Sequence, residues 1–133
     1  MERPVLVDSS AWVEYLRRTG SPTNMRLRAL LAARRRVATT EPIVLEVLMG
    51  AQSEAHADRL RKLLVSLDLR PLEGLRDAER AAQIYRGCRR RGHTVRSSVD
   101  CLIAAVALRA DLPVLALDRD FEAIAEETGL ELV

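Results

Sequence analysis

Two aspartates of this chain follow short apolar segments that are predicted to be β-strands. Asp8 ends the segment 5–8 and Asp118 follows the segment 114–117, and a helix-like sequence comes after each of them. Parallel strands present their C-terminal ends at one edge of a sheet, so these two carboxylates are expected to meet there. Because crowded carboxylates repel each other, the arrangement favours a cation bound between them.

Three further acids extend this predicted site. Asp120 lies two residues beyond Asp118, whereas Glu46 and Asp100 lie inside strongly apolar segments that are predicted to be helices. An ionised carboxylate in apolar surroundings is unfavourable unless it is paired or binds a metal ion. Each acid taken alone has an ordinary alternative role as a helix cap or as the partner of an arginine. All five together indicate one acidic, catalytic site.

The donor types indicate which metal and which chemistry such a site supports. Mg²⁺ and Mn²⁺ prefer carboxylate oxygens, whereas His56 and His93 lack the spacing of zinc ligands. A divalent cation held by several aspartates activates water and binds phosphate oxygens, which favours phosphodiester hydrolysis. The chain has no GxxxxGK, GxGxxG or GxSxG motif, so neither a nucleotide cofactor nor a serine nucleophile is indicated.

The basic residues are almost all arginine, since Lys62 is the only lysine among 21 basic residues. Biased codon usage and a solvated helix end are the ordinary explanations of this pattern. A cluster that follows residue 85 favours contact with the phosphates of a nucleic acid. The candidate RNA-binding residues are Arg86, Arg89, Arg90, Arg91 and Arg96. Aromatic residues make up only 3% of the chain, so phosphate contacts rather than extended base stacking should dominate binding.

Length and composition predict one domain, 1–133, with a substantial core, since 48% of the residues are hydrophobic. The longest uninterrupted apolar run, 101–108, is far too short to span a membrane, and no signal pattern precedes the first strand. We therefore expect a cytoplasmic protein that does not contact membranes. Cys88 and Cys101 are expected to be reduced, structural thiols.

Strand and helix patterns alternate along the chain without a linker or a repeat. Strands are predicted at 5–8, 37–39, 69–72, 114–117 and 130–133. Helices are predicted at 9–18, 22–35, 40–50, 53–67, 77–91, 98–110 and 119–128, with Ser9 or Ser10 capping the first. This alternation predicts an α/β fold, a three-layer α/β/α sandwich with a mostly parallel central sheet.

Four short motifs, in this order and spacing, resemble those of a known family. They are Asp8-Ser9-Ser10, the segment 42–50 around Glu46, the segment 98–105 around Asp100, and the segment 117–121 with Asp118 and Asp120. Together they resemble the PIN-domain ribonucleases, and specifically the VapC-type toxins of bacterial toxin–antitoxin pairs. The resemblance spans nearly the whole chain and implies a single PIN domain, 1–133.

The resemblance also implies roles for particular residues. Asp8, Asp100 and Asp118 would be ligands of Mg²⁺ or Mn²⁺, and Glu46 and Asp120 would complete the acidic pocket. Ser10 would support the site by hydrogen bonding. Ala116 departs from many relatives, which carry Thr or Ser two positions before the acid equivalent to Asp118, so the tuning of the site is expected to differ.

The resemblance further implies an endoribonuclease that cuts RNA, such as tRNA or another structured RNA, and so blocks translation. It implies a homodimer and a VapB-type antitoxin, assembled as a heterotetramer or a hetero-octamer. Two alternatives remain open from the residues themselves. One is an aspartate-nucleophile phosphatase or phosphoryl-accepting receiver, which would need a lysine near the site. The other is a non-catalytic phosphate- or protein-binding α/β module.

Overall fold

The computed structural model describes residues 2–33 and 36–133, in which strands and helices alternate as the sequence predicts. The elements in chain order are β1 (Val5–Val7), α1 (Ser9–Leu16), α2 (Pro22–Ala32), β2 (Val37–Thr39), α3 (Glu41–Met49), α4 (Glu54–Val65), β3 (Asp68–Leu69), α5 (Gly74–Arg90), α6 (Ser98–Ala110), β4 (Val114–Leu115) and α7 (Asp120–Thr128).

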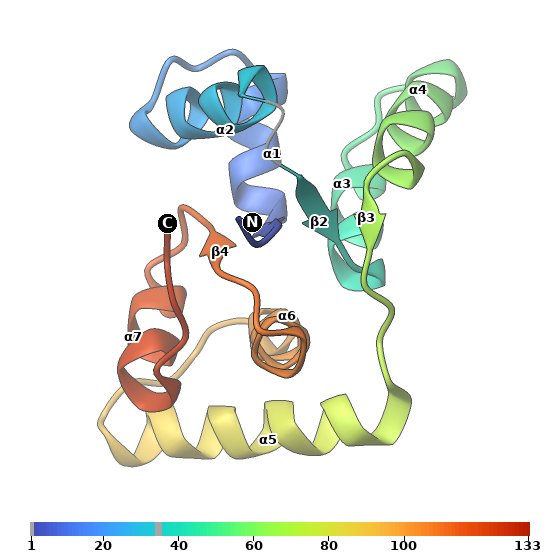
Figure 1. Ribbon diagram of the computed structural model, residues 1–133. Coiled ribbons are helices and arrows are strands. Elements are labelled where there is room, and N and C mark those ends of the chain that lie inside the picture. The colour runs from blue at the N-terminus through green and yellow to red at the C-terminus, as the bar shows by residue number, and fades with distance from the viewer. Residues whose placement is uncertain (1, 34–35) are drawn as a thin grey trace.

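The strands form one sheet, whose order in the described part of the chain is β3-β2-β1-β4. All three neighbouring pairs are parallel, with Val5 beside Val37 and Leu6 beside Val114 in the register. Figure 1 shows α1 and α2 on one side of the sheet and α5, α6 and α7 on the other. The predicted three-layer α/β/α sandwich with a parallel sheet is therefore confirmed.

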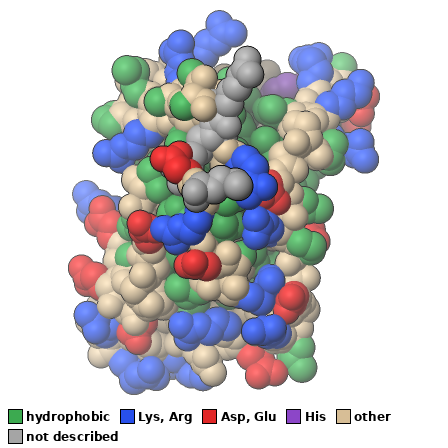
Figure 2. Space-filling view, viewed as in Figure 1, with side chains coloured by type: hydrophobic (Ala, Val, Ile, Leu, Met, Phe, Trp, Pro, Cys, Tyr) green, Lys and Arg blue, Asp and Glu red, His purple; other side chains and the backbone are tan. Residues whose placement is uncertain are grey.

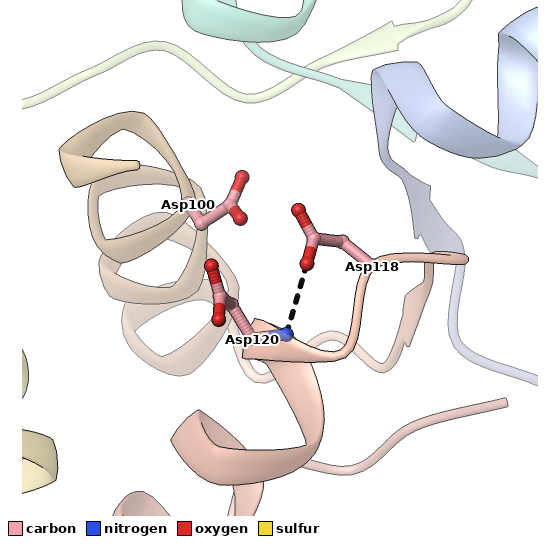
Figure 3. Close-up of side chains that lie close together, drawn as sticks. All are labelled: Asp100, Asp118 and Asp120. Atoms are coloured by element: carbon pink, nitrogen blue, oxygen red, sulfur yellow. Dashed lines mark hydrogen bonds between the residues drawn. The ribbon is translucent and has the colours of Figure 1, made fainter. Parts of the chain in front are cut away.

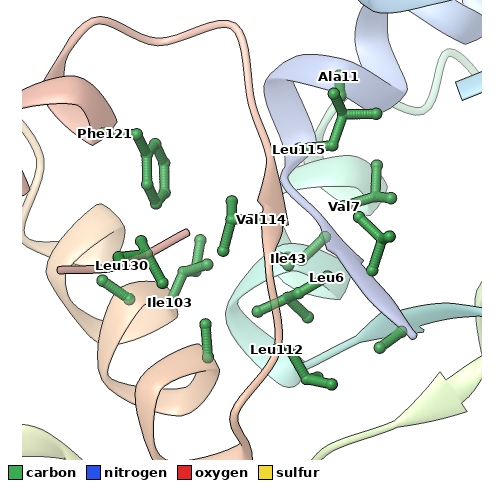
Figure 4. Close-up of a cluster of buried hydrophobic side chains, with 14 of the residues drawn as sticks. Leu6, Val7, Ala11, Ile43, Ile103, Leu112, Val114, Leu115, Phe121 and Leu130 are labelled. Carbon is green, nitrogen blue, oxygen red and sulfur yellow. The ribbon is translucent and has the colours of Figure 1, made fainter. Parts of the chain in front are cut away.

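The core lies on both faces of the two central strands. All three residues of β1 and both residues of β4 are fully buried. Figure 4 shows Ile103 and Phe121 on one side of β4 and Ala11 and Ile43 on the other. Each buried side chain of this size contributes about 1.5–3 kcal/mol relative to exposure. The central strands, and the loops that follow them, are consequently held from both sides.

Four predicted strands are shorter in the structure than the sequence indicates. The first, predicted at 5–8, ends at Val7 because Asp8 caps α1. The predicted strand 69–72 is instead Asp68–Leu69, because Pro71 has no N–H to donate and the Leu72 N–H donates to the Glu41 carboxylate, at 2.8 Å. The predicted strand 130–133 forms only a single bridge, between Val114 and Leu132, because β4 has just two residues to offer.

The predicted strand 114–117 ends at Leu115 because the Leu117 N–H donates to the Ser10 hydroxyl, at 3.0 Å, and not to a neighbouring strand. This hydrogen bond to a side chain, in place of one within the sheet, fixes the backbone next to Asp118.

Helix boundaries also differ in places. α5 begins at Gly74, not at 77, because the Asp77 carboxylate accepts the Glu73 N–H, at 2.7 Å, and so belongs to the first turn. α2 ends at Ala32, and the end predicted for it, at Arg35, lies outside the described residues.

Cys88 and Cys101 are buried free thiols. Within the described part of the chain, no helix has both the length and the apolar character that crossing a bilayer requires.

Candidate active site

The acidic residues meet where the order of the strands reverses. The chain builds β1, β2 and β3 outward in one direction and then places β4 on the other side of β1. In open parallel sheets, ligands bind at this point, outside the carboxyl ends of the strands. Asp8 follows β1 directly, Asp118 follows β4 after a short loop, and Asp100 lies in the first turn of α6.

Three of the acids form a tight group. Figure 3 shows Asp100 of α6 facing Asp118, on the loop after β4, and Asp120, at the start of α7. One carboxylate oxygen of each lies within 4.8 Å of the others. Asp118 is fixed by accepting the Asp120 N–H at 2.9 Å. Three carboxylates at this separation would repel one another strongly if all were ionised, and a divalent cation is the partner that such a group of oxygens accommodates.

Ser10 connects Asp8 to the loop that carries Asp118. The Asp8 carboxylate caps α1, because its Oδ2 accepts the Ser10 N–H at 3.1 Å and the Ser10 hydroxyl at 2.6 Å. The prediction that Ser9 or Ser10 caps this helix is therefore wrong. The same hydroxyl oxygen accepts the Leu117 N–H at 3.0 Å. A single side chain thus joins the two strand ends that the sequence analysis placed at one site.

Asp8 and Asp100 are buried with unused bonding capacity. Asp8 is 2% exposed and Asp100 is 4% exposed. Within the described part of the chain, Asp8 Oδ1 and Asp100 Oδ2 have no hydrogen-bond partner. Burial raises the pKa of Asp8. Burial, followed by the charges of Asp8 and Asp118, raises the pKa of Asp100 to about 8. A buried carboxylate oxygen without a partner is unfavourable, and these two are suited to bind a cation.

Glu46 belongs to the same electrostatic group. It is half-buried on α3, and the Ser9 hydroxyl donates to its Oε1 at 2.9 Å. Burial raises the pKa of Glu46, and the charges of Asp8 and Asp118 raise it further, although the hydrogen bond from Ser9 opposes both. The sequence does not predict this contact, since Ser9 and Glu46 are 37 positions apart.

Asp120 differs from the other acids because both of its oxygens have partners. His93 Nε2 lies 2.8 Å from Oδ1, and the Arg96 N–H donates to Oδ2 at 3.0 Å. Burial alone would raise the pKa of Asp120, but the contacts with His93 and Arg96 outweigh it and the pKa is lowered. Asp120 therefore holds the loop between α5 and α6 against α7. The sequence does not predict the contact between His93 and Asp120, which are 27 positions apart.

The predicted RNA-binding arginines do not share one surface. The exposed Arg96 guanidinium lies 3.4 Å from Asp118 and 3.7 Å from Asp120. Arg86, Arg89 and Arg96 line one groove, whereas Arg91 lines a different cavity beside His93 and α7. Figure 2 shows basic side chains along the edge of the molecule where α5 runs in Figure 1, with acidic side chains among them.

The donor set fits a hard divalent cation. Asp100, Asp118 and Asp120 offer carboxylate oxygens within 4.8 Å of one another, and Asp8 is not part of that group. The two unpartnered carboxylate oxygens belong to Asp8 and Asp100. Neither free cysteine joins this group, since Cys88 and Cys101 are buried in the helix layer of α5 and α6. All-oxygen donors of this kind suit Mg²⁺ or Mn²⁺ and not zinc.

Comparison with known proteins identifies the family to which this chain is related. The family model of the PIN domain matches residues 5–127. Ribonuclease VapC11 of Mycobacterium tuberculosis is 43% identical over 128 residues, which covers 96% of each chain. Among solved structures, VapBC2 of Rickettsia felis, bound to a DNA fragment from its promoter, aligns over 98% of both chains with a TM-score of 0.75 at 13% identity. VapC20 of M. tuberculosis, a toxin that cleaves the sarcin–ricin loop, aligns over 90% of this chain and 93% of its own, with a TM-score of 0.66 at 19% identity.

These matches agree with the fold and the acidic group described above. The chain belongs to the PIN-domain family. Within that family it belongs with the VapC ribonucleases, the toxin enzymes of toxin–antitoxin pairs. The solved structures have low sequence identity to this chain and therefore show only that the fold is shared. The relative that is 43% identical shows the family.

Proposed function

We propose that this VapC-family protein hydrolyses phosphodiester bonds of RNA at the acidic site and thereby blocks translation. The observation that carries the proposal is the pair of buried carboxylate oxygens, on Asp8 and Asp100, that have no partner among the described residues. Such oxygens are costly to a protein unless a ligand uses them. Their position at the reversal of strand order adds support.

The residues divide into ligands and supports. Asp8, Asp100 and Asp118 would hold Mg²⁺ or Mn²⁺, which lowers the pKa of a bound water and stabilises charge on the phosphate. Ser10 fixes Asp8 and the Asp118 loop relative to each other. Glu46, with its raised pKa and its hydrogen bond from Ser9, is suited to accept a proton at Oε2. Asp120 completes the pocket and holds Arg96 beside it.

The substrate is proposed to be tRNA or another structured RNA. Arg86, Arg89, Arg90, Arg91 and Arg96 are all exposed and would hold the RNA backbone through phosphate oxygens. The division of Arg86, Arg89 and Arg96 from Arg91 suits a substrate that passes the acidic site on more than one side. The relative VapC20 cleaves a structured RNA loop, which supports the same class of substrate here.

The partner is proposed to be a VapB-type antitoxin. The solved VapBC2 structure is a toxin–antitoxin complex with this fold. On α3, next to Glu46, the apolar side chains of Leu45 and Met49 are 57% and 74% exposed. Large exposed apolar residues beside an active site suit a protein partner that covers it. We propose a homodimer of this chain that binds the antitoxin as a heterotetramer or hetero-octamer in the cytoplasm.

Sequencing of RNA ends after induced expression tests this function. Hydrolysis by activated water leaves a 5′-phosphate and a 3′-hydroxyl. We expect new 5′-phosphate ends in tRNA or another structured RNA in cells that express the wild-type chain, and none in cells that express Asp8→Asn.

Ends that carry a 5′-hydroxyl and a cyclic phosphate would contradict the mechanism. RNA that is bound but never cut would favour a non-catalytic binding module.

A further inference from the structure

A groove between α5 and α6 lies next to the acidic site without belonging to it. Its volume is about 780 Å³, and its lining comes from one face of α5, from the loop before α6 and from the first turns of α6. A groove of this size can take a ligand as large as a nucleotide. None of the acidic residues contributes to it.

Small and apolar side chains line much of this groove. Ala78, Ala81 and Ala82 line it from α5, and Cys101 and Leu102 line it from α6. Small side chains at three positions of one helix let a planar group approach the helix closely. Cys101 is 1% exposed and Ala81 7% exposed, so these two residues belong to the core, whereas Ala78 and Ala82 are exposed.

Tyr85 forms one wall of the groove. Its ring is half-buried and packs against the core, and the Arg89 guanidinium lies over the ring at 5.7 Å from the centroid. A fixed aromatic ring that already carries a planar cation is a surface on which a nucleobase can stack. Tyr85 and Arg89 are four residues apart and therefore lie on one face of α5.

The rim of the groove is positively charged and reaches the acidic site. Arg86, Arg89 and Arg96 line the groove, and its described lining includes no acidic residue. The cavity on the other side of the α5 end differs, because Glu122 and Glu126 line it together with Arg91. Arg96 is shared, since its guanidinium also lies 3.4 Å from Asp118. Arg96 therefore connects the groove to the acidic site.

We propose that this groove binds one nucleotide of the RNA next to the scissile phosphate. The base stacks on Tyr85 over the alanines of α5, and its phosphate contacts Arg86, Arg89 or Arg96. The proposal rests on the proposed ribonuclease function and adds a base-binding subsite to it. It also gives one aromatic residue a role in substrate binding, in addition to the phosphate contacts that the sequence predicts.

The test measures RNA binding without cleavage. Fluorescence anisotropy with a labelled single-stranded RNA in EDTA gives the Kd of the wild-type chain and of four variants. We expect Tyr85→Ala to raise the Kd about 10-fold, the loss typical of one base–aromatic stack. Tyr85→Phe keeps the ring and should bind within about two-fold of the wild type, whereas Ala82→Leu fills the groove and should weaken binding as Tyr85→Ala does.

Arg80→Ala is the matched control, because Arg80 is an exposed arginine of α5 that lines a separate cavity. It should weaken binding less than Tyr85→Ala does. RNA that contains 5-iodouridine should crosslink to Tyr85 under ultraviolet light, and mass spectrometry of the peptides identifies the crosslinked residue. Circular dichroism melting of each variant shows whether the fold is kept.

Three results would overturn the proposal. If the wild type binds RNA and Tyr85→Ala and Ala82→Leu bind equally well, the groove is not a subsite, and the proposed function stands. If those variants change only the oligomeric state in analytical ultracentrifugation, the groove is a contact between copies of this chain. If the wild type neither binds nor cuts RNA, the proposed function fails and the subsite fails with it.

Discussion

Asp100→Asn should stabilise the metal-free protein, although it removes a proposed metal ligand. Asp100 is buried, and its pKa is raised from 3.8 to about 8 by burial and by the charges of Asp8 and Asp118. The folded chain therefore keeps a proton on Asp100 that the unfolded chain has released. The free energy of unfolding consequently falls as the pH rises from the unfolded pKa to the folded one, and the fall ends above about pH 8.

The magnitude follows from the size of this pKa difference. Each pH unit within that window costs about 1.4 kcal/mol, so the cost accumulated by about pH 7 is about 4 kcal/mol. Asparagine carries no charge at any pH and avoids this cost. Because Asp8 and Glu46 still repel each other in the variant, we expect a gain of about 2–4 kcal/mol, or about 10 °C in Tm.

Urea unfolding in EDTA, measured between about pH 5 and pH 8, gives the required free energies. The wild type should lose stability as the pH rises, and Asp100→Asn should flatten that slope. Addition of Mn²⁺ should raise the Tm of the wild type and leave that of the variant nearly unchanged.

Asp77→Asn is the matched control, because Asp77 is also a buried helical aspartate but is paired with Arg109 at 2.8 and 3.0 Å. That pairing lowers the pKa of Asp77. Asp77→Asn should therefore destabilise the protein, by about 2 kcal/mol or more. If Asp100→Asn also destabilised the chain in EDTA, or if the wild-type stability did not fall with rising pH, the account of a repulsive acidic site would be wrong.

Three further predictions follow from the contacts. Ser10→Ala removes the link between Asp8 and the Leu117 backbone and should weaken Mn²⁺ binding about 10-fold by calorimetry; unchanged affinity would mean that Ser10 does not position the ligands. Arg96→Ala removes the cation beside Asp118, so it should tighten Mn²⁺ binding about two- to five-fold and weaken RNA binding. If the variant bound both Mn²⁺ and RNA more weakly, this role of Arg96 would be wrong. Ile103→Ala, in the core, should cost about 3 kcal/mol in urea unfolding while the cleavage rate per folded molecule stays at the wild-type value.

The sequence could predict the members of the acidic group for two separate physical reasons. Asp8 and Asp118 follow strands, and parallel strands align their carboxyl ends, so their proximity follows from topology. Glu46 and Asp100 conflict with the apolar pattern around them, and a polar residue that breaks such a pattern needs a reason in the fold. The structure brings all of these side chains to one electrostatic group.

What the sequence could not predict depends on contacts between distant segments. The bond from Ser9 to Glu46, the pairing of His93 with Asp120 and the bridge from Ser10 to Leu117 each join separate elements. The ends of β3 and β4 were mispredicted because a strand lasts only as long as its neighbour pairs with it. A helical period could have separated Arg86 and Arg89 from Arg91, since only the first two share a face of α5 with Tyr85.

We expect that a metal ion held by the acidic group makes this chain a ribonuclease. The most direct measurement is the cleavage of end-labelled RNA by the purified wild type and by Asp8→Asn, each with Mg²⁺ and with EDTA, after circular dichroism has shown that both are folded. We predict cleavage by the wild type with Mg²⁺ alone, and none by Asp8→Asn under either condition. Cleavage by the wild type in EDTA, or wild-type cleavage by Asp8→Asn with Mg²⁺, would contradict the account.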